Sequence, residues 1–245
     1  MTGLGLSGRV GIVTGGASGI GFSIVKTLTD EGAVVVVFDL NPATAPASAA
    51  FSVEVDVADE PAVAAAFAAF DQRFDRLDFL VNNAGIDIET VPTSEWQEGP
   101  LHRTLDVDIK GTYHCMRHAI NRMLPNNAGS IVNLGSVAAL VGTATRPAYA
   151  ASKHAVVGLT RTAGIQFGPN NIRTNVVCPG GTRTDLLERV MTDNPELRQQ
   201  ILSSNPMRRL AEPSEIADAV AWLVSPRSSF VNGAVIPVDG GYTAA

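Results

Sequence analysis

The stretch Thr14-Gly15-Gly16-Ala17-Ser18-Gly19-Ile20-Gly21 decides the fold, because two different sequence patterns meet in it. Before it, Val10–Thr14 is a short β-branched run of the kind that forms a buried strand. After it, Gly19–Asp30 carries apolar residues at helical spacing. Glycines at such a junction permit a tight turn and let backbone N–H groups approach a pyrophosphate at the positive end of the helix. A plain strand–helix turn also contains glycines, so this interpretation depends on the rest of the chain.

The remaining sequence repeats the alternation of short apolar runs and amphipathic stretches. Further strands are predicted at Val34–Phe38, Val53–Val55, Phe79–Val81, Ser130–Leu134, Thr174–Cys178 and Val235–Val238. Further helices are predicted at Ala62–Phe74, from about Leu101 to Met123, at Tyr149–Phe167 and at Ser214–Ser225, with a less regular region at Leu186–Leu202. This alternation implies βαβ crossovers. We therefore expect an α/β, Rossmann-like doubly wound fold: a mostly parallel seven-stranded sheet with helices on both faces, in one domain over residues 1–245.

One connection is expected to differ from a full crossover. The segment Asn41–Ala50 lies between two predicted parallel strands and reads as turn-like (NPATAPASAA). It is too short for a complete crossover helix of the usual βαβ unit. We therefore expect an abbreviated link there.

The composition restricts the classes of partner and compartment. The chain has 18 Lys and Arg against 24 Asp and Glu, a net charge of −6 at pH 7. Nucleic acids and anionic membranes select for clustered basic residues, so neither is expected as a partner. The two cysteines, Cys115 and Cys178, form no C-x-x-C motif, which argues against a disulfide framework or a four-cysteine zinc site. Without a recognisable signal peptide or an apolar run of about 20 residues, we expect a cytoplasmic protein.

Asp39 supports a dinucleotide site and indicates which cofactor it takes. It ends the second predicted strand, 18 residues after Gly21. A carboxylate at this distance accepts hydrogen bonds from the ribose hydroxyls. It also repels a 2′-phosphate, and neither Ser18 nor Leu40 supplies a compensating cation. A solvated acid at a strand end is common by itself, but together with the glycines it favours NAD over NADP.

Three polar residues form a second candidate site. Tyr149 and Lys153 are four residues apart, which on a helix places them one turn apart on the same face. An unperturbed phenol titrates near about 10, and a neighbouring cation favours the phenolate. Ser136 follows the fifth predicted strand, at the edge of the sheet where doubly wound folds bind ligands. Tyr149 is thus a candidate general acid–base, with Ser136 placed to hold a substrate oxygen.

These residues, in this order, resemble the short-chain dehydrogenase/reductase family over essentially the whole chain. The matching motifs are Thr14–Gly21, Asp56, Asn82-Asn83-Ala84-Gly85, Ser136, Tyr149-x-x-x-Lys153 and Pro179-Gly180. The resemblance implies that Tyr149 is the catalytic acid/base, that Ser136 orients the carbonyl or hydroxyl group, and that Lys153 favours the phenolate and binds the nicotinamide ribose.

The same resemblance implies a set of cofactor contacts. Asp56 and Val57 are expected to flank adenine, Asn83 to line the cofactor cleft, and Thr182 and Thr184 to meet the nicotinamide end. The full set of expected cofactor-binding residues is Gly15, Ser18, Gly19, Ile20, Gly21, Asp39, Leu40, Asp56, Val57, Asn83, Ala84, Gly85, Tyr149, Lys153, Pro179, Gly180, Thr182 and Thr184.

Asp108 departs from the family pattern. Counted from Gly111, it stands where the family carries an Asn that completes a proton relay through water to the lysine. An aspartate keeps an acceptor oxygen but loses the amide donors, and when ionised it adds a charge near Lys153. We include Asp108 among the catalytic residues and hypothesise that the relay survives with an altered pH profile.

The expected activity is NAD-dependent hydride transfer between a secondary alcohol and its ketone. The expected pocket wall is largely apolar, which suits a compact apolar or alicyclic substrate; it comprises Ile86, Ile88, Trp96, Val137, Leu140, Val141, Leu186, Leu187 and Met191. The segments Lys153–Thr160 and Asp239–Thr243 are similar to family members that act on cyclic alcohols and dihydrodiols. Arg146 is a candidate anchor for an anionic substrate, against a solvated or interface arginine.

Two alternative functions stay open. A 3-oxoacyl-carrier-protein reductase is disfavoured by Asp39, because such enzymes usually resemble NADP-selective members. The second alternative is an NAD-binding regulator or pseudoenzyme, in which Asp108 has broken the proton relay. His114 and His118 have a zinc-compatible spacing but no obvious third ligand, so no metal is expected and a helix surface or interface is the better interpretation.

The resemblance also implies a homo-oligomer, a tetramer or a dimer.

Overall fold

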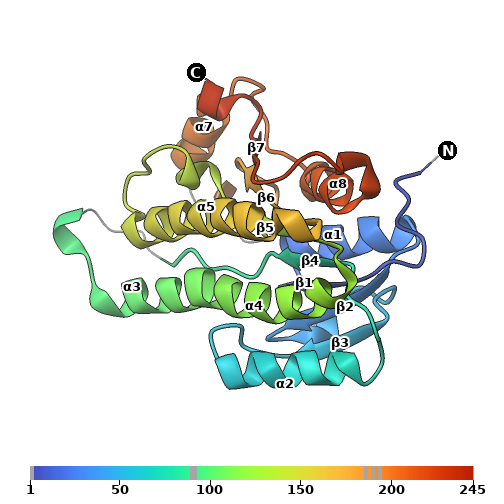
Figure 1. Ribbon diagram of the computed structural model, residues 1–245. Helices are drawn as coiled ribbons and strands as arrows, with labels where there is room; N and C mark the ends of the chain where they lie inside the picture. The colour runs from blue at the N-terminus through green and yellow to red at the C-terminus, as the bar shows by residue number, and fades with distance from the viewer. Residues whose placement is uncertain (1–2, 89–92, 185–186, 189–190, 193–194, 245) are drawn as a thin grey trace.

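A parallel β-sheet forms the centre of the computed structural model, which describes residues 3–88, 93–184, 187–188, 191–192 and 195–244. Within these residues the sheet has seven strands in the order β3-β2-β1-β4-β5-β6-β7 (Figure 1). The strands are β1 (Val10–Thr14), β2 (Val34–Asp39), β3 (Phe51–Glu54), β4 (Phe79–Asn82), β5 (Gly129–Leu134), β6 (Ile172–Pro179) and β7 (Val235–Val238). Every pairing between neighbouring strands of the described part is parallel, which confirms the predicted fold class.

The strand order reverses between β1 and β4. From β1 the chain runs outward through β2 to β3, and it then returns to place β4 on the other side of β1. Thr14 at the end of β1 is in register with Asn82 at the end of β4, so the loops after both strands begin side by side. In doubly wound sheets ligands bind outside the carboxyl ends of the strands at such a reversal. The glycine turn and the Asn83 loop both lie there.

Both faces of the sheet are buried, as the apolar strands predict. Along β2, Val36 and Phe38 belong to one hydrophobic cluster, whereas Val35 and Val37 belong to the cluster on the opposite face. The first face is covered by α2 (Glu60–Asp71), α4 (Thr112–Met123) and part of α5 (Pro147–Phe167). The second is covered by α1 (Gly19–Asp30) and α8 (Pro213–Val224), as Figure 1 shows.

The predicted boundaries agree with the structure to within a few residues, and the short link is confirmed. Between β2 and β3 the segment predicted to be abbreviated contains a single 3₁₀ turn, Pro42–Thr44. The predicted region at Leu186–Leu202 is only partly described; its C-terminal part is helix α7 (Pro195–Ser204). Leu186 lies outside the described residues.

The helix predicted from about Leu101 to Met123 is divided into three consecutive parts. These are α3 (Glu98–Thr104), a π-helical segment (Leu105–Gly111) and α4. Periodicity does not distinguish an α-turn from the slightly wider π-turn, so the sequence predicted a uniform helix. The Thr112 hydroxyl donates a hydrogen bond of 2.7 Å to the carbonyl oxygen of Asp108 within this region. Single π-turns inside α-helices are frequent at functional sites, and this one carries Asp108.

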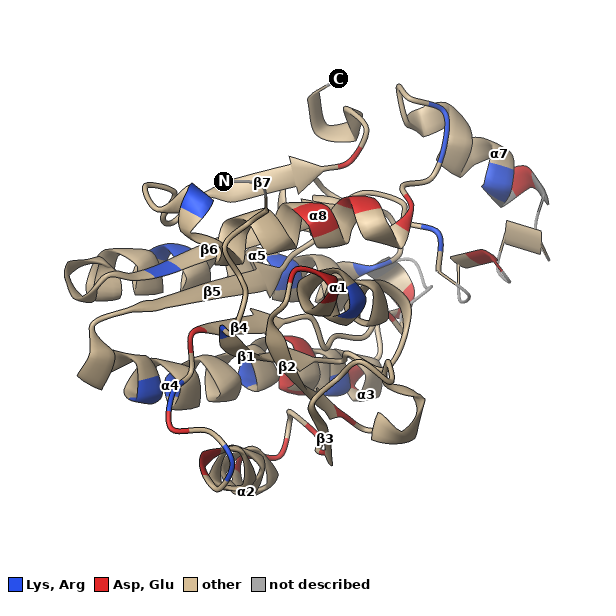
Figure 2. Ribbon diagram, turned by 90° about the vertical axis from the view of Figure 1, so that its right-hand side faces the viewer, with Lys and Arg blue, Asp and Glu red and all other residues tan. Residues whose placement is uncertain are grey.

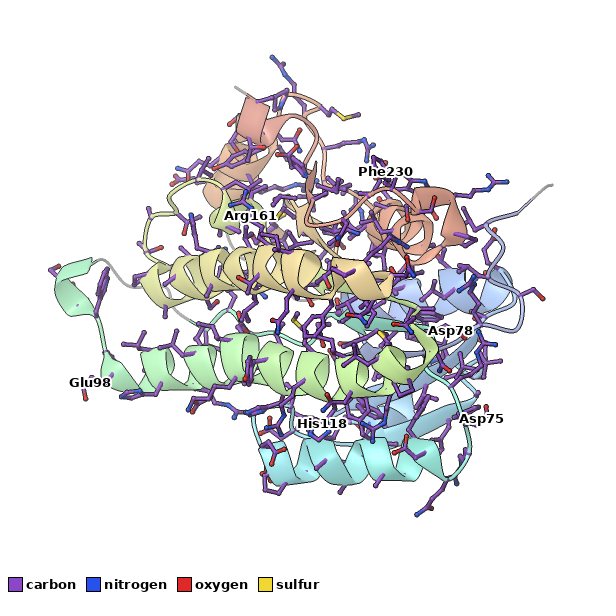
Figure 3. All side chains as sticks on the ribbon, viewed as in Figure 1. Asp75, Asp78, Glu98, His118, Arg161 and Phe230 are labelled. Atoms are coloured by element: carbon purple, nitrogen blue, oxygen red, sulfur yellow. The ribbon has the colours of Figure 1, made fainter. Side chains whose placement is uncertain are left out.

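His114 and His118 face α2 and the loop before it rather than forming an outer surface. The His118 ring stacks on Phe67 and lies 3.1 Å from Glu60 Oε1, between α4 and α2 (Figure 3). His114 Nδ1 lies 3.1 Å from the Val57 carbonyl oxygen. These two histidines are therefore part of the contact between α4 and the α2 region.

Charged residues are spread over many elements. Figure 2 shows basic positions on α4, acidic positions on α8 and both signs on α7 and in the connecting loops, so neither sign is confined to one element. Among the described residues, no helix is long and apolar enough to cross a membrane.

Candidate active site

The glycine turn has the geometry of a phosphate-binding loop. Gly15 has a φ of +62°, and a Cβ there would lie 2.9 Å from the Ala84 Cα, so both the conformation and the space require glycine. The first amide of α1 with a helical partner is that of Phe22, which donates to the Ser18 carbonyl at 3.0 Å. Within the described part, the amides of Gly19 and Ile20 have no protein acceptor. Amides in this position at a helix N-terminus bind phosphate groups.

Asn83 and Thr14 hold this turn against β4. The Asn83 side-chain amide donates to the carbonyl oxygens of Thr14 at 3.1 Å and Gly15 at 2.9 Å. In return, the Thr14 hydroxyl accepts hydrogen bonds from the backbone amides of Asn83 and Ala84 at 3.1 and 3.0 Å. The side-chain amide of Asn83 thus holds the backbone of the glycine turn in place. The sequence pattern did not indicate this role.

Asp39 ends β2 and reaches the glycine turn. Its Oδ2 accepts a hydrogen bond of 3.0 Å from the Ala17 amide, and its Oδ1 accepts one of 2.9 Å from the Asn41 amide. These two bonds fix the carboxylate of Asp39 against the glycine turn at Ala17. This is the position in which a ribose-binding acid is expected.

The residues expected around adenine are held by neighbouring elements. Asp56 accepts a hydrogen bond from the Ala58 amide at 2.9 Å and pairs with Arg103 at 3.0 Å. The Val57 side chain is buried and approaches Gly111 so closely that a Cβ on Gly111 would lie 2.6 Å from its Cγ2. Val57 therefore fixes the π-helical segment to this loop, and its part in adenine binding stays a prediction.

The two threonines after β6 have different surroundings. Thr182 is buried, and its hydroxyl donates to the Gly180 carbonyl at 3.1 Å. Thr184 lies beside the glycine turn, because its Cγ2 is 3.5 Å from the place where a Cβ on Gly19 would stand. The structure thus brings Thr184 to the phosphate cradle.

Tyr149 and Lys153 lie in the first two turns of α5, and Lys153 reaches the end of β5. The Lys153 ammonium lies 5.4 Å from the centre of the Tyr149 ring and donates to the Leu134 carbonyl at 3.4 Å. Ser136 follows β5 by two residues; it is largely buried, and its hydroxyl accepts a hydrogen bond of 3.1 Å from the Ala138 amide. The ends of β5 and α5 therefore bring the predicted catalytic residues to one edge of the sheet.

Asp108 is the most tightly held of the predicted catalytic residues. Its side chain is fully buried. Asp108 Oδ1 accepts a hydrogen bond of 2.8 Å from the Ile86 amide, and Oδ2 accepts one of 2.9 Å from the Ser152 hydroxyl. Oδ2 also lies 3.3 Å from Lys153 Nζ. The predicted charge near Lys153 is thus a direct ion pair.

The ion pair between Lys153 and Asp108 affects the pKa of Lys153. Burial by itself lowers the pKa of Lys153, but the charge of Asp108 and then that of Tyr149 outweigh burial and hold the pKa above its usual value. Asp87 adds a smaller effect in the same direction. On the other side of the site, burial raises the pKa of the Cys178 thiol to about 11, although the Ser136 amide and Lys153 oppose it. Lys153 is therefore a cation and Cys178 a neutral thiol at neutral pH.

Three features of the site were missed by sequence reasoning. The Ser152 hydroxyl, inside the Tyr149-x-x-x-Lys153 motif, lies 2.9 Å from Asp108 Oδ2 and 2.8 Å from the Tyr149 carbonyl oxygen, and its one proton is shared between these two acceptors. Gly85 leaves room for the pair, since a Cβ there would lie 2.9 Å from Lys153 Nζ and 3.2 Å from Asp108 Oδ1. Asp87 forms an ion pair of 2.9 Å with Arg146. Each depends on residues that are distant in the sequence, so no local pattern marks it.

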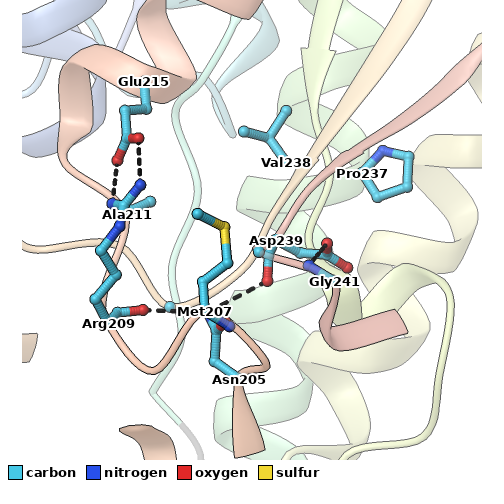
Figure 4. A pocket seen from close by; sticks show the side chains of 11 residues that line it. Asn205, Met207, Arg209, Ala211, Glu215, Pro237, Val238, Asp239 and Gly241 are labelled. Atoms are coloured by element: carbon cyan, nitrogen blue, oxygen red, sulfur yellow. Dashed lines mark hydrogen bonds and ion pairs between the residues drawn. The ribbon is translucent and has the colours of Figure 1, made fainter. Parts of the chain in front are cut away.

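The C-terminal tail supports the end of β6. The Asp239 carboxylate accepts hydrogen bonds from the Gly241 amide and from the amide and hydroxyl of Thr243. A Cβ on Gly180 would lie 2.9 Å from the Asp239 Cα, so glycine is required where the tail crosses. A cavity of about 320 Å³ opens here (Figure 4). The described residues that line it are Gly181, Asn205, Met207, Arg209, Ala211, Glu215, Pro237, Val238, Asp239, Gly240 and Gly241.

Comparison with known proteins decides the family. A family described as "Enoyl-(Acyl carrier protein) reductase" matches residues 15–243. The chain is 40% identical, over 98% of both proteins, to the 2,5-dichloro-2,5-cyclohexadiene-1,4-diol dehydrogenase of Sphingobium indicum. The chain is a short-chain dehydrogenase/reductase. It is also 38% identical to the cis-4-hydroxycyclohexanecarboxylate dehydrogenase of Sinomonas cyclohexanicum, over 96% of this chain and 97% of that protein.

Solved structures agree with this assignment. The crystal structure of an NAD+-bound xylitol dehydrogenase superposes with a TM-score of 0.93 at 32% identity, covering 96% of this chain and 99% of that one. As a short-chain dehydrogenase/reductase, the protein is an oxidoreductase that acts on CH–OH groups, and its relatives are dehydrogenases of secondary and cyclic alcohols. The predicted family and enzyme class are thereby confirmed.

Proposed function

We propose that this enzyme transfers a hydride reversibly between NAD and a secondary alcohol, with Tyr149 as the general acid–base. The observation that carries the proposal is the Lys153 ammonium 5.4 Å from the Tyr149 ring, held by Asp108 at the edge of the sheet where Ser136 also lies. A cation beside a phenol favours the phenolate, which is the form that accepts a proton.

Each protein group has a defined task in the oxidation of an alcohol. The Ser136 hydroxyl holds the substrate oxygen, and the Tyr149 phenolate accepts the hydroxyl proton. Lys153 stabilises the phenolate before the transfer, and Asp108 keeps Lys153 in place. The nicotinamide cofactor, when bound, accepts the hydride from the carbinol carbon. In the direction of ketone reduction, Tyr149 returns the proton.

We propose NAD rather than NADP because of Asp39. The residues present fit a dinucleotide: a Cβ on Gly15 or Gly21 would clash with backbone atoms, and the leading amides of the turn lack protein acceptors in the described part. Solved structures among the matches carry NAD+ in one case and NADP in another, so relatedness does not select between them. The Asp39 carboxylate, fixed by the Ala17 and Asn41 amides, accepts ribose hydroxyls and repels a phosphate.

We propose a compact, ring-shaped secondary alcohol as substrate. The names of both curated relatives described above specify six-membered rings bearing a hydroxyl group. Of the residues predicted to wall the pocket, Ile88 and Trp96 are about half exposed, so they offer apolar surface to a ligand. Leu140, by contrast, packs against a core cluster that includes Val156 and Cys178.

We also propose a homo-oligomer in a cytoplasmic compartment, on the evidence of the exposed apolar residues and the free thiols. Tyr113 on α4 and Ile165 on α5 are 52% and 82% exposed, which supports a homo-oligomer formed through these two helices. Both cysteines are free and buried, which supports a reducing, cytoplasmic compartment.

The proposal is tested by an absorbance assay of NADH or NADPH formation over cyclic, aryl and aliphatic secondary alcohols. We expect turnover of cyclic alcohols with NAD, and a loss of about 10²–10⁴-fold in kcat for Tyr149→Phe. NADH binding, followed by fluorescence, is expected to persist in that variant. Full turnover by Tyr149→Phe would refute the role of the phenol, and a strong preference for NADP would refute the role of Asp39.

A further inference from the structure

An ion pair stands beside the proposed catalytic residues and has no part in the hydride transfer described above. Arg146 Nη1 lies 2.9 Å from Asp87 Oδ2. Arg146 immediately precedes α5, three residues before Tyr149. Asp87 lies two residues after Gly85, where an added Cβ would meet Lys153 Nζ and Asp108 Oδ1. The pair therefore joins the loop after β4 to the start of the catalytic helix.

Both members of the pair are accessible to a ligand. Their side chains are 44% exposed for Arg146 and 28% exposed for Asp87. Arg146 is three residues from Tyr149, and Asp87 is two residues from Gly85, whose Cα faces Lys153 and Asp108. Accessible charges held at these two positions can contact a substituent of the substrate.

The chemistry of the pair selects the substituent. A hydroxyl group donates one hydrogen bond and accepts others, so it can donate to the Asp87 carboxylate and accept from the Arg146 guanidinium at once. A carbonyl group can accept from Arg146. A carboxylate would compete with Asp87 for Arg146 and would be repelled by the Asp87 charge. Because Asp87 already neutralises Arg146, the ion pair argues against the predicted role of Arg146 as an anchor for an anionic substrate.

We propose that the Asp87–Arg146 pair is a specificity element that recognises a second hydroxyl or carbonyl oxygen on the substrate. This inference rests on the proposed alcohol dehydrogenase function and narrows its substrate class to diols and hydroxyketones. The reacting hydroxyl is bound by Ser136 and Tyr149, while the distant oxygen is bound by Asp87 and Arg146. A cyclic alcohol with a single hydroxyl group has no second oxygen to bind to Asp87 and Arg146.

The test compares cyclohexanol with cyclohexane-1,4-diol in the NAD-coupled assay, with 4-hydroxycyclohexanecarboxylate as the anionic analogue. After division by two for its two hydroxyl groups, the diol is expected to have a kcat/KM at least about tenfold above that of cyclohexanol. Asp87→Asn and Arg146→Gln are each expected to lower this ratio toward one, mainly through a higher KM for the diol. A contact made equally in the ground state and the transition state changes KM rather than kcat.

The matched controls are Asp71→Asn and Arg122→Gln, which break an ion pair of 2.6 Å between α2 and α4. They are expected to leave the ratio unchanged. Because exposed ion pairs contribute little to stability, all four variants are expected to fold, and circular dichroism with NADH binding verifies this.

Three outcomes overturn the inference. One is an equal kcat/KM for diol and cyclohexanol in the unaltered enzyme. Another is a diol-to-cyclohexanol ratio of kcat/KM that stays the same in Asp87→Asn and Arg146→Gln. The ion pair would then only connect the two loops and would not contact the substrate. The last is selective loss of the carboxylate substrate in Arg146→Gln, which would make Arg146 an anion anchor. If the enzyme turns over no alcohol with either cofactor, the proposed function itself is refuted. That result differs from the three above, each of which requires measurable turnover.

Discussion

Lys153 Nζ lies 3.3 Å from Asp108 Oδ2, and the side chains are 6% and 0% exposed. A buried charge is tolerated only when it is paired and its remaining hydrogen-bonding capacity is used. Here the Ile86 amide and the Ser152 hydroxyl bind the carboxylate, and the Leu134 carbonyl binds the ammonium. The pair therefore fixes the loop after β4, the π-helical segment and α5 relative to one another.

Replacement of Asp108 by Asn is expected to shift the pH dependence of catalysis. The amide keeps an oxygen for the Ile86 N–H and offers its NH₂ group to the Ser152 hydroxyl, so the fold is retained. Loss of the carboxylate charge removes the largest effect that opposes burial at Lys153, so the pKa of the ammonium is expected to fall. We expect the alkaline limb of the kcat/KM profile to move to lower pH, because Lys153 then loses its charge at lower pH. Profiles of the two proteins that superimpose would contradict this.

Replacement of Asp39 by Ser is expected to relax the choice of cofactor. Serine keeps an acceptor oxygen but removes the charge and one of the two acceptor positions used by Ala17 and Asn41. Hydrogen bonds to a charged group contribute about 1.5–3 kcal/mol, so kcat/KM for NAD is expected to fall about tenfold or more. The value for NADP is expected to rise. Asp30→Ser, which removes an exposed acid from the same strand–helix unit, serves as the control.

Gly85→Ala is expected to impair catalysis without unfolding the enzyme. The added Cβ would lie 2.9 Å from Lys153 Nζ, so the ammonium must move away from Asp108 or from Tyr149. We expect kcat to fall by about tenfold or more, since small displacements in an active site have large effects. Gly158→Ala on α5 is the matched control.

A Cβ on Gly158 meets nothing within 4 Å in the described structure. Alanine in a helix is favoured over glycine by about 1 kcal/mol, so Gly158→Ala is expected to raise stability slightly and to keep full activity. If both substitutions leave kcat unchanged, the space at Gly85 is not needed for catalysis.

The two cysteines are expected to be unreactive in the folded enzyme. Burial raises the pKa of Cys115 to about 12, and burial is also the largest cause that raises that of Cys178 to about 11. At about pH 8, a thiol-disulfide reagent is expected to modify neither thiol in the folded state and both in urea, because the thiolate is the reactive form. Rapid modification of one thiol without urea would show that its site is open to solvent.

The same pKa shifts predict loss of stability in alkali. An unfolded thiol ionises around 9.0, whereas the folded thiols hold their protons to higher pH. Above this value the unfolded state binds fewer protons than the folded state, so the free energy of unfolding falls as pH rises. The raised pKa of Lys153 acts in the same direction, since stability from that cation is fully present below its unfolded pKa. Urea denaturation at about pH 7 and pH 10 measures the effect.

Several residues of the candidate site could be placed from the sequence because their surroundings are local. The glycine turn, Asp39 and the Tyr149–Lys153 spacing each depend on a short segment joined to one strand or helix end. The carboxyl ends of parallel strands meet at one edge, so the fold class was enough to place Ser136 near α5.

The contacts that tune the site could not be predicted in this way. Asp108 and Ser152 are 44 residues apart, and Asp108 and Ile86 are 22 apart. Asp87 and Arg146 reside on two loops whose sequences show no shared pattern. The π-turn that carries Asp108 has the same apolar period as the helices around it, so periodicity predicted an uninterrupted helix.

The sequence by itself determined the parallel sheet, the nucleotide cradle and the family. It did so because hydrophobic period and glycine positions act over a few residues and depend little on the rest of the chain. Only the tertiary structure decided that Asp108 neutralises Lys153 and that Asp87 neutralises Arg146. An ion pair depends on the distance between two charges, and that distance is set by the packing of β4, α5 and the π-helical segment against one another.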